Sequence, residues 1–291
     1  MFQRILFPVD FSPRSTSIAG AVRAYANASG AEVYLVHVLE LPELVMTMPE
    51  FPAYMPPDMQ AVYRDNAAIR LRRCAEEALP GVTVHEALLE GEPASEIAQF
   101  AAENNIDLLM IPTHGVGGFR RFLIGSTTAK ILHDVRCPVW TSVHDETDHG
   151  DHHHLIRSPR NVVCGVDFAP TSDAVIAYAD VFAKRTGAEV TLVHAVPKIS
   201  SRPTNYMDVD FDAHMTQEAK LRADEVQARL GTSYPVLFVP GDPADVLREA
   251  VEKTAADLAI VGRSHLMEGF ASIQSHTYDV INKCPCPVLS V

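Results

Sequence analysis

The chain has 291 residues, which is the length of about two domains. Hydrophobic residues make up 47% of it and charged residues 21%, a balance typical of a globular protein with material for two packed cores. The formal net charge of −13 argues against a nucleic-acid partner, because proteins that bind the phosphate backbone usually carry a basic face. It does not exclude a nucleotide, which a few backbone amides and one or two cations can hold.

The sequence offers no candidate for a membrane span or a secretion signal. No apolar run approaches the roughly 18 residues that cross a bilayer. The N-terminus, MFQRILFPVD, has a short apolar run that meets a proline and an aspartate, which is not the anatomy of a signal peptide. The five cysteines are odd in number and scattered, so they do not indicate a disulfide framework. We therefore expect a cytoplasmic, reduced protein.

The sequence repeats itself once. Four segments of the first half return in the same order in the second half: RILFPVDFSPRS from Arg4 as NVVCGVDFAPTS from Asn161, AEVYLVHV from Ala31 as AEVTLVHA from Ala188, GEPASEIAQFAAENNIDLLMI from Gly91 as GDPADVLREAVEKTAADLAIV from Gly241, and CPVW from Cys137 as CPVL from Cys286. The offset drifts only from 157 for the first pair to 149 for the last, which indicates that a whole domain was duplicated. The predicted domains are 1–143 and 158–291, joined by a linker over 144–157.

Within each unit, short apolar runs alternate with segments of helical periodicity. The run ILFPV at 5–9 predicts a strand covered on both faces, and Ser12 or Ser15 can cap a helix that Gly30 ends. The other elements expected in the first unit are a strand over 32–38, a helix over 58–79, a strand over 82–89, a helix over 93–104, a strand over 106–111, a helix from Ser126 and a strand over 138–143. Five strands alternating with four helices predict an α/β fold, in which each tandem domain is a doubly wound, five-stranded parallel sheet.

Sheets of this kind bind ligands beyond the carboxyl ends of their strands, where the strand order reverses. Asp10, the first charged residue after the first expected strand, lies at this edge. Its carboxylate can accept hydrogen bonds from a ribose or an amino group. The alternative is that Asp10 only caps a helix or stabilises a turn.

A glycine-rich loop lies at the same edge, within the stretch MIPTHGVGGFRRFLIGSTTAK (110–130). Gly115 and Gly125 can expose backbone amides with no Cβ in the way. The N–H groups of Ser126 and Thr127 belong to the first turn of a helix, so they lack intrahelical partners and lie at its positive end. This arrangement suits a phosphate, to which the two hydroxyl groups add donors.

Three cationic or titratable side chains of this loop, His114, Arg120 and Arg121, can add to a phosphate site. The alternative is that the glycines only make a turn, that Ser126 caps the helix and that the arginines are solvated. The loop does not match the Walker pattern, since no Gly-Lys-Ser/Thr occurs. It does not match GxGxxG either, because Arg120 stands in the place of the last glycine.

Both halves resemble the universal stress protein family, and the whole chain resembles its tandem-domain members. The resemblance is carried by ILFPVDFS near the N-terminus, LVHV on the second expected strand and the glycine-rich loop. It implies an adenine nucleotide alpha hydrolase-like, Rossmann-like fold. In nucleotide-binding members the loop reads Gly, two residues, Gly, nine residues, Gly and then Ser or Thr. Gly115, Gly125 and Ser126 match this motif, but Pro112 replaces its first glycine and has no N–H to offer.

The resemblance implies an ATP site in the first domain. Adenine and ribose would lie against Pro8, Val9, Asp10, Val38 and Ile111, and the phosphates on Gly115, Gly125, Ser126 and Thr127, beside Pro112 and His114. Mg²⁺ can accompany ATP, but no metal is required. No residue stands out as a catalytic base, so at most slow hydrolysis is expected.

The second domain departs further from the motif. The weak equivalents of the site residues there are Asp167, Gly262 and Ser275. His265 and Gln274 replace two glycines of the loop, and a Cβ at each position should keep the backbone away from a phosphate. We expect this domain to bind nucleotide weakly or not at all.

Three further features allow other roles. A segment at 144–155, HDETDHGDHHHL, can chelate Zn²⁺ or Ni²⁺ or serve as a solvated linker; its histidines are His144, His149, His152, His153 and His154. The segment LPELVMTMPEFPAYMPP at 41–57 can be a lid, a patch for an apolar ligand or protein, or a loop over its own sheet. Cys284 and Cys286 suggest a redox or metal role, and the simpler interpretation is that they are small core residues.

The leading functional hypothesis is a stress-response sensor or regulator that binds ATP or a related adenine nucleotide in its first domain. The rival hypothesis is a non-enzymatic scaffold that binds a metal, an apolar ligand or a protein partner without nucleotide. The resemblance also implies that the two domains pair through their last strands, and a homodimer is a further expectation. A hydrolase or transferase is disfavoured, because the spacing shows no Ser-His-Asp arrangement or nucleophile elbow.

Overall fold

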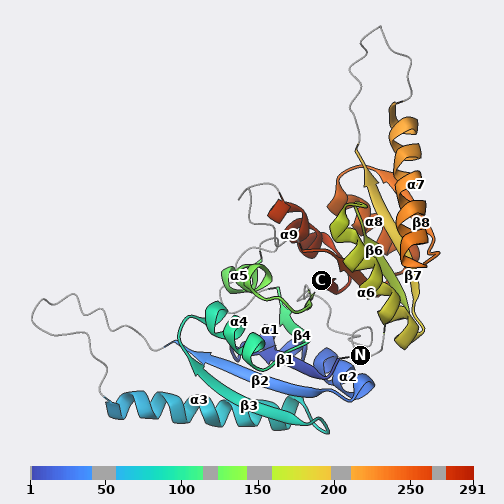
Figure 1. The fold of residues 1–291 in the computed structure, drawn as a ribbon. Helices are drawn as coiled ribbons and strands as arrows, with labels where there is room; N and C mark the ends of the chain where they lie inside the picture. Colours follow the sequence, from blue (N-terminus) through green and yellow to red (C-terminus); the bar gives the residue numbers. More distant parts are fainter. Residues whose placement is uncertain (1, 41–56, 114–123, 143–158, 198–210, 264–272) are drawn as a thin grey trace, which may run out of the picture. The chain divides into compact units, whose positions relative to one another are not determined.

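The computed structural model describes residues 2–40, 57–113, 124–142, 159–197, 211–263 and 273–291. The chain forms two compact units, whose main bodies are Phe2–Val139 and Ser158–Val291 (Figure 1). The linker predicted over 144–157 and the methionine-rich segment over 41–56 lie outside the described residues. Within the ranges that are described, no helix combines the length and the hydropathy that a membrane span needs.

The first half of the chain is built on a parallel sheet. Its elements in chain order are β1 (Arg4–Pro8), α1 (Pro13–Ser17), α2 (Ala19–Ser29), β2 (Glu32–Leu39), α3 (Pro57–Ala78), β3 (Val84–Glu90), α4 (Pro93–Glu103), β4 (Leu108–Pro112), α5 (Ser126–Asp134) and β5 (Val139–Ser142). The strands follow the order β3-β2-β1-β4-β5, and β1 pairs in parallel with both β2 and β4. The expected alternation of strands and helices is confirmed, and the ends of the strands differ from the prediction by at most two residues.

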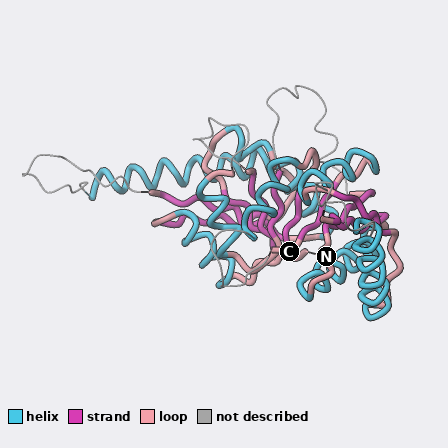
Figure 2. Tube along the Cα trace, turned by 90° about the horizontal axis from the view of Figure 1, so that it is seen from above, coloured by secondary structure: helices cyan, strands magenta, loops and turns pink. Residues whose placement is uncertain are grey.

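The second unit repeats this order of elements. It consists of β6 (Asn161–Gly165), α6 (Pro170–Thr186), β7 (Glu189–Val196), α7 (Phe211–Leu230), β8 (Val236–Pro240), α8 (Pro243–Thr254), β9 (Leu258–Val261), α9 (Ile273–Lys283) and β10 (Val288–Ser290). Its strand order is β10-β9-β6-β7-β8, so its first strand is also central, between the second and the fourth strand of the unit. Figure 2 shows the strands in magenta with helices in cyan beside them. The doubly wound α/β fold predicted for both halves is confirmed.

The central strands are buried along almost their whole length, as the apolar runs in the sequence predicted. Every residue of β4 is buried, and in β1 only Arg4 is partly exposed. Phe7 of β1 and Leu109 of β4 have no exposed surface. The edge strand β3 mixes exposed and partly exposed residues. Strands covered on both faces have no polar side to present, which is why these segments read as continuous apolar runs.

The first helix differs from the prediction. We expected one helix up to Gly30, whereas the chain forms α1 and α2, separated at Ile18. The hydroxyl groups of Ser15, Thr16 and Ser17 all donate hydrogen bonds to backbone carbonyls one turn earlier. Such bonds compete with the helical pattern and bend a helix, and three of them in succession account for the break.

Glycines end the corresponding helices of the two units. Gly30 follows α2 with φ 68° and Gly187 follows α6 with φ 73°, both in the left-handed region. The N–H of Gly187 donates to the carbonyl of Ala183, which closes the last turn. Residues with a Cβ rarely adopt this conformation, so these glycines fix where each helix stops and the next strand begins.

Candidate functional site

The carboxyl ends of β1 and β4 form the edge at which the predicted site lies. The two strands are neighbours and run parallel, with Ile5 opposite Leu108 and Leu6 opposite Leu109. In the sheet, β2 lies on one side of β1 and β4 lies on the other side. The strand order therefore reverses between β1 and β4. This is the point at which doubly wound sheets hold ligands. The structure therefore brings together the ends of the two strands that carry the predicted residues.

The start of α5 is tied to the end of β4 by the chain's own hydrogen bonds. The N–H of Gly125 donates to the carbonyl of Thr113 over 3.0 Å, and the hydroxyl of Thr128 donates to the carbonyl of Pro112 over 3.2 Å. Gly125 is the N-cap residue, with φ −59° and ψ 149°, and no side chain caps the helix. The helix thus begins at Ser126, as predicted, and its first turn faces the edge of the sheet.

The first N–H groups of α5 are the donors that matter for an anion. Among the residues that the structure describes, none accepts a hydrogen bond from the N–H of Ser126 or Thr127. Ser126 is exposed and Thr127 is partly exposed. These N–H groups lie at the positive end of the helix dipole, which favours a negative charge in front of them.

Asp10 has the turn-stabilising role, one of the two that the sequence left open, and its side chain is also exposed. It is exposed, directly after β1, and its Oδ1 accepts a hydrogen bond from the N–H of Ser12 at 2.9 Å. Ser12 in turn caps α1, since its hydroxyl accepts a hydrogen bond from the N–H of Ser15. The carboxylate is therefore held by the turn while it remains exposed at the edge.

The other predicted residues of the first domain divide into three groups. Pro8, Val9, Ile111 and Pro112 are buried at the ends of β1 and β4, and Val38 near the end of β2 is partly exposed. The two loop residues His114 and Gly115 lie outside the described residues, as do Arg120 and Arg121. The histidines of the linker, His144, His149, His152, His153 and His154, also lie outside them.

Sequence reasoning missed a stack of three side chains beside Asp10. The ring of Phe11 lies 4.3 Å from the ring of His37 on β2, and the guanidinium carbon of Arg70 on α3 lies 4.3 Å from the centre of the Phe11 ring. His37 Nδ1 is 2.7 Å from the carbonyl oxygen of Val9. Because Phe11 has a left-handed backbone with φ 59°, its ring turns back toward β2. This stack forms one side of the edge at which Asp10 is exposed.

A signal for part of this stack was present in the repeat. Phe168 and His194 occupy the corresponding positions of the second unit, where Phe168 has φ 56° and the two rings lie 5.0 Å apart. His194 Nδ1 also contacts a carbonyl oxygen of the strand before it, that of Val166, over 2.9 Å. Because both halves of the sequence repeat the Asp-Phe pair and the histidine, the contact between Phe and His could have been inferred from the sequence. Arg70 could not, because the second unit places Phe238 against the same rings.

The packing around His37 changes the pKa of its ring, which can be tested. Burial lowers the pKa of His37 below its ordinary value of 6.5, with Arg70 acting in the same direction and the Val9 carbonyl and Asp10 opposing it. A histidine with a lowered pKa in the folded state stabilises the fold fully above pH 6.5, and this contribution is lost as the pH falls below that value.

We therefore expect an NMR titration of the His37 ring to show a midpoint below 6.5. We also expect His37→Gln, which keeps a donor for the Val9 carbonyl, to remove part of the loss of stability between about pH 6.5 and 5. Urea unfolding at the two pH values measures the second effect. A titration midpoint at or above 6.5 would contradict the assignment.

The equivalent edge of the second unit carries Asp167, which is exposed as Asp10 is. Asp167 Oδ1 accepts a hydrogen bond from the hydroxyl of Ser172 at 2.6 Å and another from the N–H of Ala169 at 2.9 Å. The hydroxyl of Thr277 donates to the carbonyl of Gly262 over 3.4 Å, as Thr128 does to Pro112. For Ser275 the structure describes only its place in α9. The second unit thus keeps the hydrogen bond between its fourth strand and its last helix, and Asp167 accepts a hydrogen bond from the N–H two residues later, as Asp10 does.

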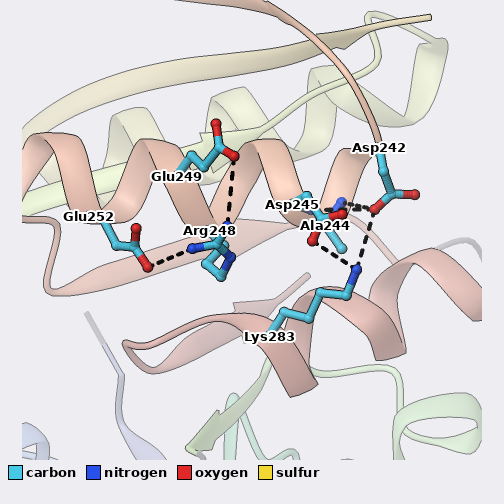
Figure 3. A network of polar contacts seen from close by, with 7 residues as sticks. All are labelled: Asp242, Ala244, Asp245, Arg248, Glu249, Glu252 and Lys283. Carbon is cyan, nitrogen blue, oxygen red and sulfur yellow. Dashed lines mark hydrogen bonds and ion pairs between the residues drawn. The ribbon is translucent and has the colours of Figure 1, made fainter. Parts of the chain in front are cut away.

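In each unit a lysine links the last helix to the start of the helix before it. Lys130 of α5 lies 2.9 Å from Glu92, which caps α4. Figure 3 shows the counterpart in the second unit, where Lys283 of α9 lies 2.9 Å from Asp245 and 3.7 Å from Asp242, the cap of α8. Each link joins the last helix of its unit to the helix before it through side chains that are largely exposed.

Glu92 should contribute to stability in a pH-dependent way. The ammonium of Lys130, followed by the hydroxyl and N–H of Ser95, lowers the pKa of Glu92 from 4.5 to about 2. The stabilisation is therefore complete above pH 4.5 and is lost as the pH falls toward 2. Because Lys130 and Glu92 are both largely exposed, we expect the total to be about 1 kcal/mol or less.

Urea unfolding of Glu92→Gln between about pH 5 and 2.5 tests this expectation, since the variant should lose less stability with acid than the wild type. Glu76→Gln, at an exposed position of α3, is the matched control and should follow the wild type. Parallel acid curves for the wild type and Glu92→Gln would count against the role of this carboxylate.

Metal ligands are sparse in the part of the chain that the structure describes. No group of three or more His, Cys, Asp or Glu side chains lies there in a position to hold a metal ion. The described groups at the edge where the site is predicted are the N–H groups at the start of α5 and the carboxylate of Asp10, with the stack of Phe11, His37 and Arg70 beside them.

The comparison with known proteins decides the family. A model of the universal stress protein family matches residues 1–142 and again residues 159–291. The chain belongs to the universal stress protein family. The two matches also confirm the tandem arrangement that the repeat predicted.

Similar proteins include other members of this family. A universal stress protein of Mycobacterium bovis is 27% identical over 275 residues, which cover 90% of this chain and 86% of that protein. One from Methanocaldococcus jannaschii is 30% identical over 139 residues, 48% of this chain and 81% of that protein. The crystal structure of a universal stress protein from Archaeoglobus fulgidus matches 99% of this chain and 95% of its own, with 20% identity and a TM-score of 0.68. At that identity the likeness supports the fold of the chain.

Proposed function

We propose that the first domain of this universal stress protein binds ATP or a related adenine nucleotide. The phosphates lie before the N-terminus of α5, where the N–H groups and hydroxyls of Ser126 and Thr127 donate to them. The ribose lies beside the carboxylate of Asp10. Mg²⁺ accompanies the phosphates when the ligand is ATP, and the protein itself supplies no dedicated metal site.

The single observation that carries this proposal is the start of α5. Its first N–H groups have no acceptor among the described residues, while Gly125 and Thr128 fix the helix to the end of β4. A helix N-terminus fixed beside the switch point of the sheet is a preformed place for an anion. Asp10, at the end of the adjacent strand β1, has an exposed carboxylate. It can accept a hydrogen bond from a neutral, hydroxyl-bearing group of the same ligand.

Pro112 should lower the affinity for the nucleotide. It has no N–H and is buried at the end of β4, so it cannot donate to the ligand through its amide. Its carbonyl accepts the hydroxyl of Thr128, as the carbonyl of Gly262 accepts that of Thr277, so the proline leaves this tie in place. We infer that the site is retained with fewer donors.

The proposal assigns different roles to the two domains. In the second domain His265 and Gln274 take the places of two glycines of the loop, and a Cβ at each position is expected to keep the backbone away from a phosphate. The first domain therefore binds the nucleotide, and the second supplies a surface for partners. The protein acts as a sensor or regulator in the stress response, with at most slow hydrolysis. A cytoplasmic location, the pairing of the domains through their last strands and a homodimer remain predictions.

Isothermal titration of ATP into the full chain tests the proposal. We expect one site per chain in the wild type and tighter binding in Pro112→Gly, which restores the missing N–H. If neither protein gives heat at high micromolar ATP, the loop is structural and the proposal fails. The rival role as a scaffold for a metal, an apolar ligand or a protein would then stand, and mass spectrometry of the co-purifying molecules would identify its ligand.

A further inference from the structure

Two thiol groups lie side by side where α9 ends and β10 begins. Cys284 follows the last residue of α9 and is buried, with 4% of its surface exposed. Cys286, two residues later, is partly exposed, and Pro285 between them is exposed. The two sulfur atoms are 3.6 Å apart, within hydrogen-bonding distance for thiols. The pair is thus preformed, next to the exposed Pro285.

The fold does not require a thiol at the buried position. The two domains align through Cys137-Pro138 and Cys286-Pro287, which places Val135 at the position of Cys284. Val135 is buried too, with 2% exposed surface, so the first domain fills the same place with an aliphatic side chain. A second sulfur beside Cys286 is therefore a feature of the second domain alone.

The surroundings of the pair favour a bound cation. Cys284 comes directly after the carboxyl end of α9, the negative end of the helix dipole. The carboxylate of Asp257 is close enough to Cys286 to act on its thiol electrostatically, and it is held in place by the N–H groups of Arg160 and Asn161. Negative potential opposes two free thiolates, and a monovalent cation between the sulfurs reduces their combined charge from −2 to −1.

The number and kind of ligands select the class of ion. In the part of the chain that the structure describes, no third His, Cys, Asp or Glu side chain joins the pair in a position to hold a metal. Zn²⁺ in proteins requires about four ligands, three of them from the protein even in open sites. Thiolate sulfur is a soft ligand that selects Cu(I) among the first-row metals. A site of two sulfurs fits a soft monovalent ion of low coordination number.

We propose that Cys284 and Cys286 bind one soft monovalent metal ion of the Cu(I) class through both sulfurs. Binding releases the two thiol protons to solvent, changes no oxidation state and leaves a Cys–metal–Cys bridge between the end of α9 and β10. The partly exposed Cys286 is the residue that turns to admit the ion. This site is independent of the nucleotide site proposed for the first domain.

Anaerobic titration of the reduced full chain with Cu(I), in the presence of a competing Cu(I) chelator, tests the site. Cys284→Val, which copies Val135 of the first domain, and Cys286→Ser should each lose one bound ion or weaken its binding at least about a hundredfold. Cys137→Ser is the matched control and should bind like the wild type. The histidine-rich segment is present in every variant, so any ion that it holds cancels in the comparison.

X-ray absorption at the copper edge gives a second, independent measurement. We expect two sulfur neighbours in the wild type and in Cys137→Ser. The proposal is overturned if the wild type and both cysteine variants take up equal amounts of Cu(I), or if the bound copper has only nitrogen or oxygen neighbours.

Discussion

Replacing Ser126 with proline is expected to weaken ATP binding by the first domain about tenfold or more. The change removes one N–H group that the helix does not use and that the proposal assigns to a phosphate, and hydrogen bonds to charged groups contribute about 1.5–3 kcal/mol. Proline suits this position, because Ser126 is the first residue of α5. Gly125 before it is extended, with ψ 149°, which is the conformation that a following proline prefers.

Ser126→Ala is the matched control for this experiment. It keeps the N–H and removes only the hydroxyl, so it should lose less affinity than the proline variant. Isothermal titration measures the affinities, and circular dichroism shows whether both variants remain folded. Equal affinity of the wild type and Ser126→Pro would show that the helix N-terminus does not hold the phosphates, even if ATP binds elsewhere on the chain.

Leu109→Ala is expected to destabilise the first domain by about 2–5 kcal/mol. Leu109 has no exposed surface, and it lies in β4 opposite Leu6 of β1, at the centre of the sheet. Truncating it leaves a cavity between elements that are fixed by the hydrogen bonds of the sheet, so the site can collapse only partly. Because β4 leads to the start of α5, a weakened sheet should also lower the population of nucleotide-competent protein.

Ile69→Ala provides the control for the effect of burial. Ile69 lies on α3 with 66% of its surface exposed, so its truncation should change the free energy of unfolding by about 0.5 kcal/mol or less. Urea unfolding of both variants and of the wild type measures the difference. If Leu109→Ala is no less stable than Ile69→Ala, the result contradicts the burial of Leu109 in the interior of the sheet.

Local chemistry made much of the fold predictable from the sequence. The buried strands were recognisable because strands covered on both faces need apolar residues throughout, and β1 and β4 show this over ILFPV and IDLLMI. Gly30 was expected to stop the first helix, and it does so in a left-handed conformation. The start of α5 at Ser126 was also predicted, because the glycine before two hydroxyl residues signals a helix N-terminus.

The break at Ile18 was not predictable from apolar spacing. The spacing of Ile18, Val22 and Tyr25 is helical, and these residues are indeed buried. The break comes from the hydroxyl groups of Ser15 and Thr16, which bond back to the carbonyl of Ser12. Whether a serine or threonine in a helix bonds to the backbone or points to solvent depends on the packing around it, which the sequence does not state.

The turns after β1 and β6 show how a difference at the cap position accompanies different hydrogen bonds of the nearby serine. In the first domain Ser12 caps the following helix with its side chain. In the second domain Ala169 stands at the cap and offers no side-chain acceptor, and the hydroxyl of Ser172 bonds to Asp167 instead. The repeated Asp-Phe pair is visible in the sequence, but the hydrogen bonds of its carboxylates are not.

The sequence by itself determined the duplication, the doubly wound α/β fold of each half and the membership of the universal stress protein family. These follow from the order of apolar runs and turn residues, which act locally along the chain. Only the tertiary structure decided which side chains meet at the edge of the sheet. Phe11, His37 and Arg70 come from a turn, a strand and a helix far apart in sequence, and they stack because the sheet brings β1 and β2 together while α3 packs against β2. The adjacent sulfurs of Cys284 and Cys286 likewise depend on how the chain turns from α9 into β10, since residues two apart face each other only in a particular backbone conformation.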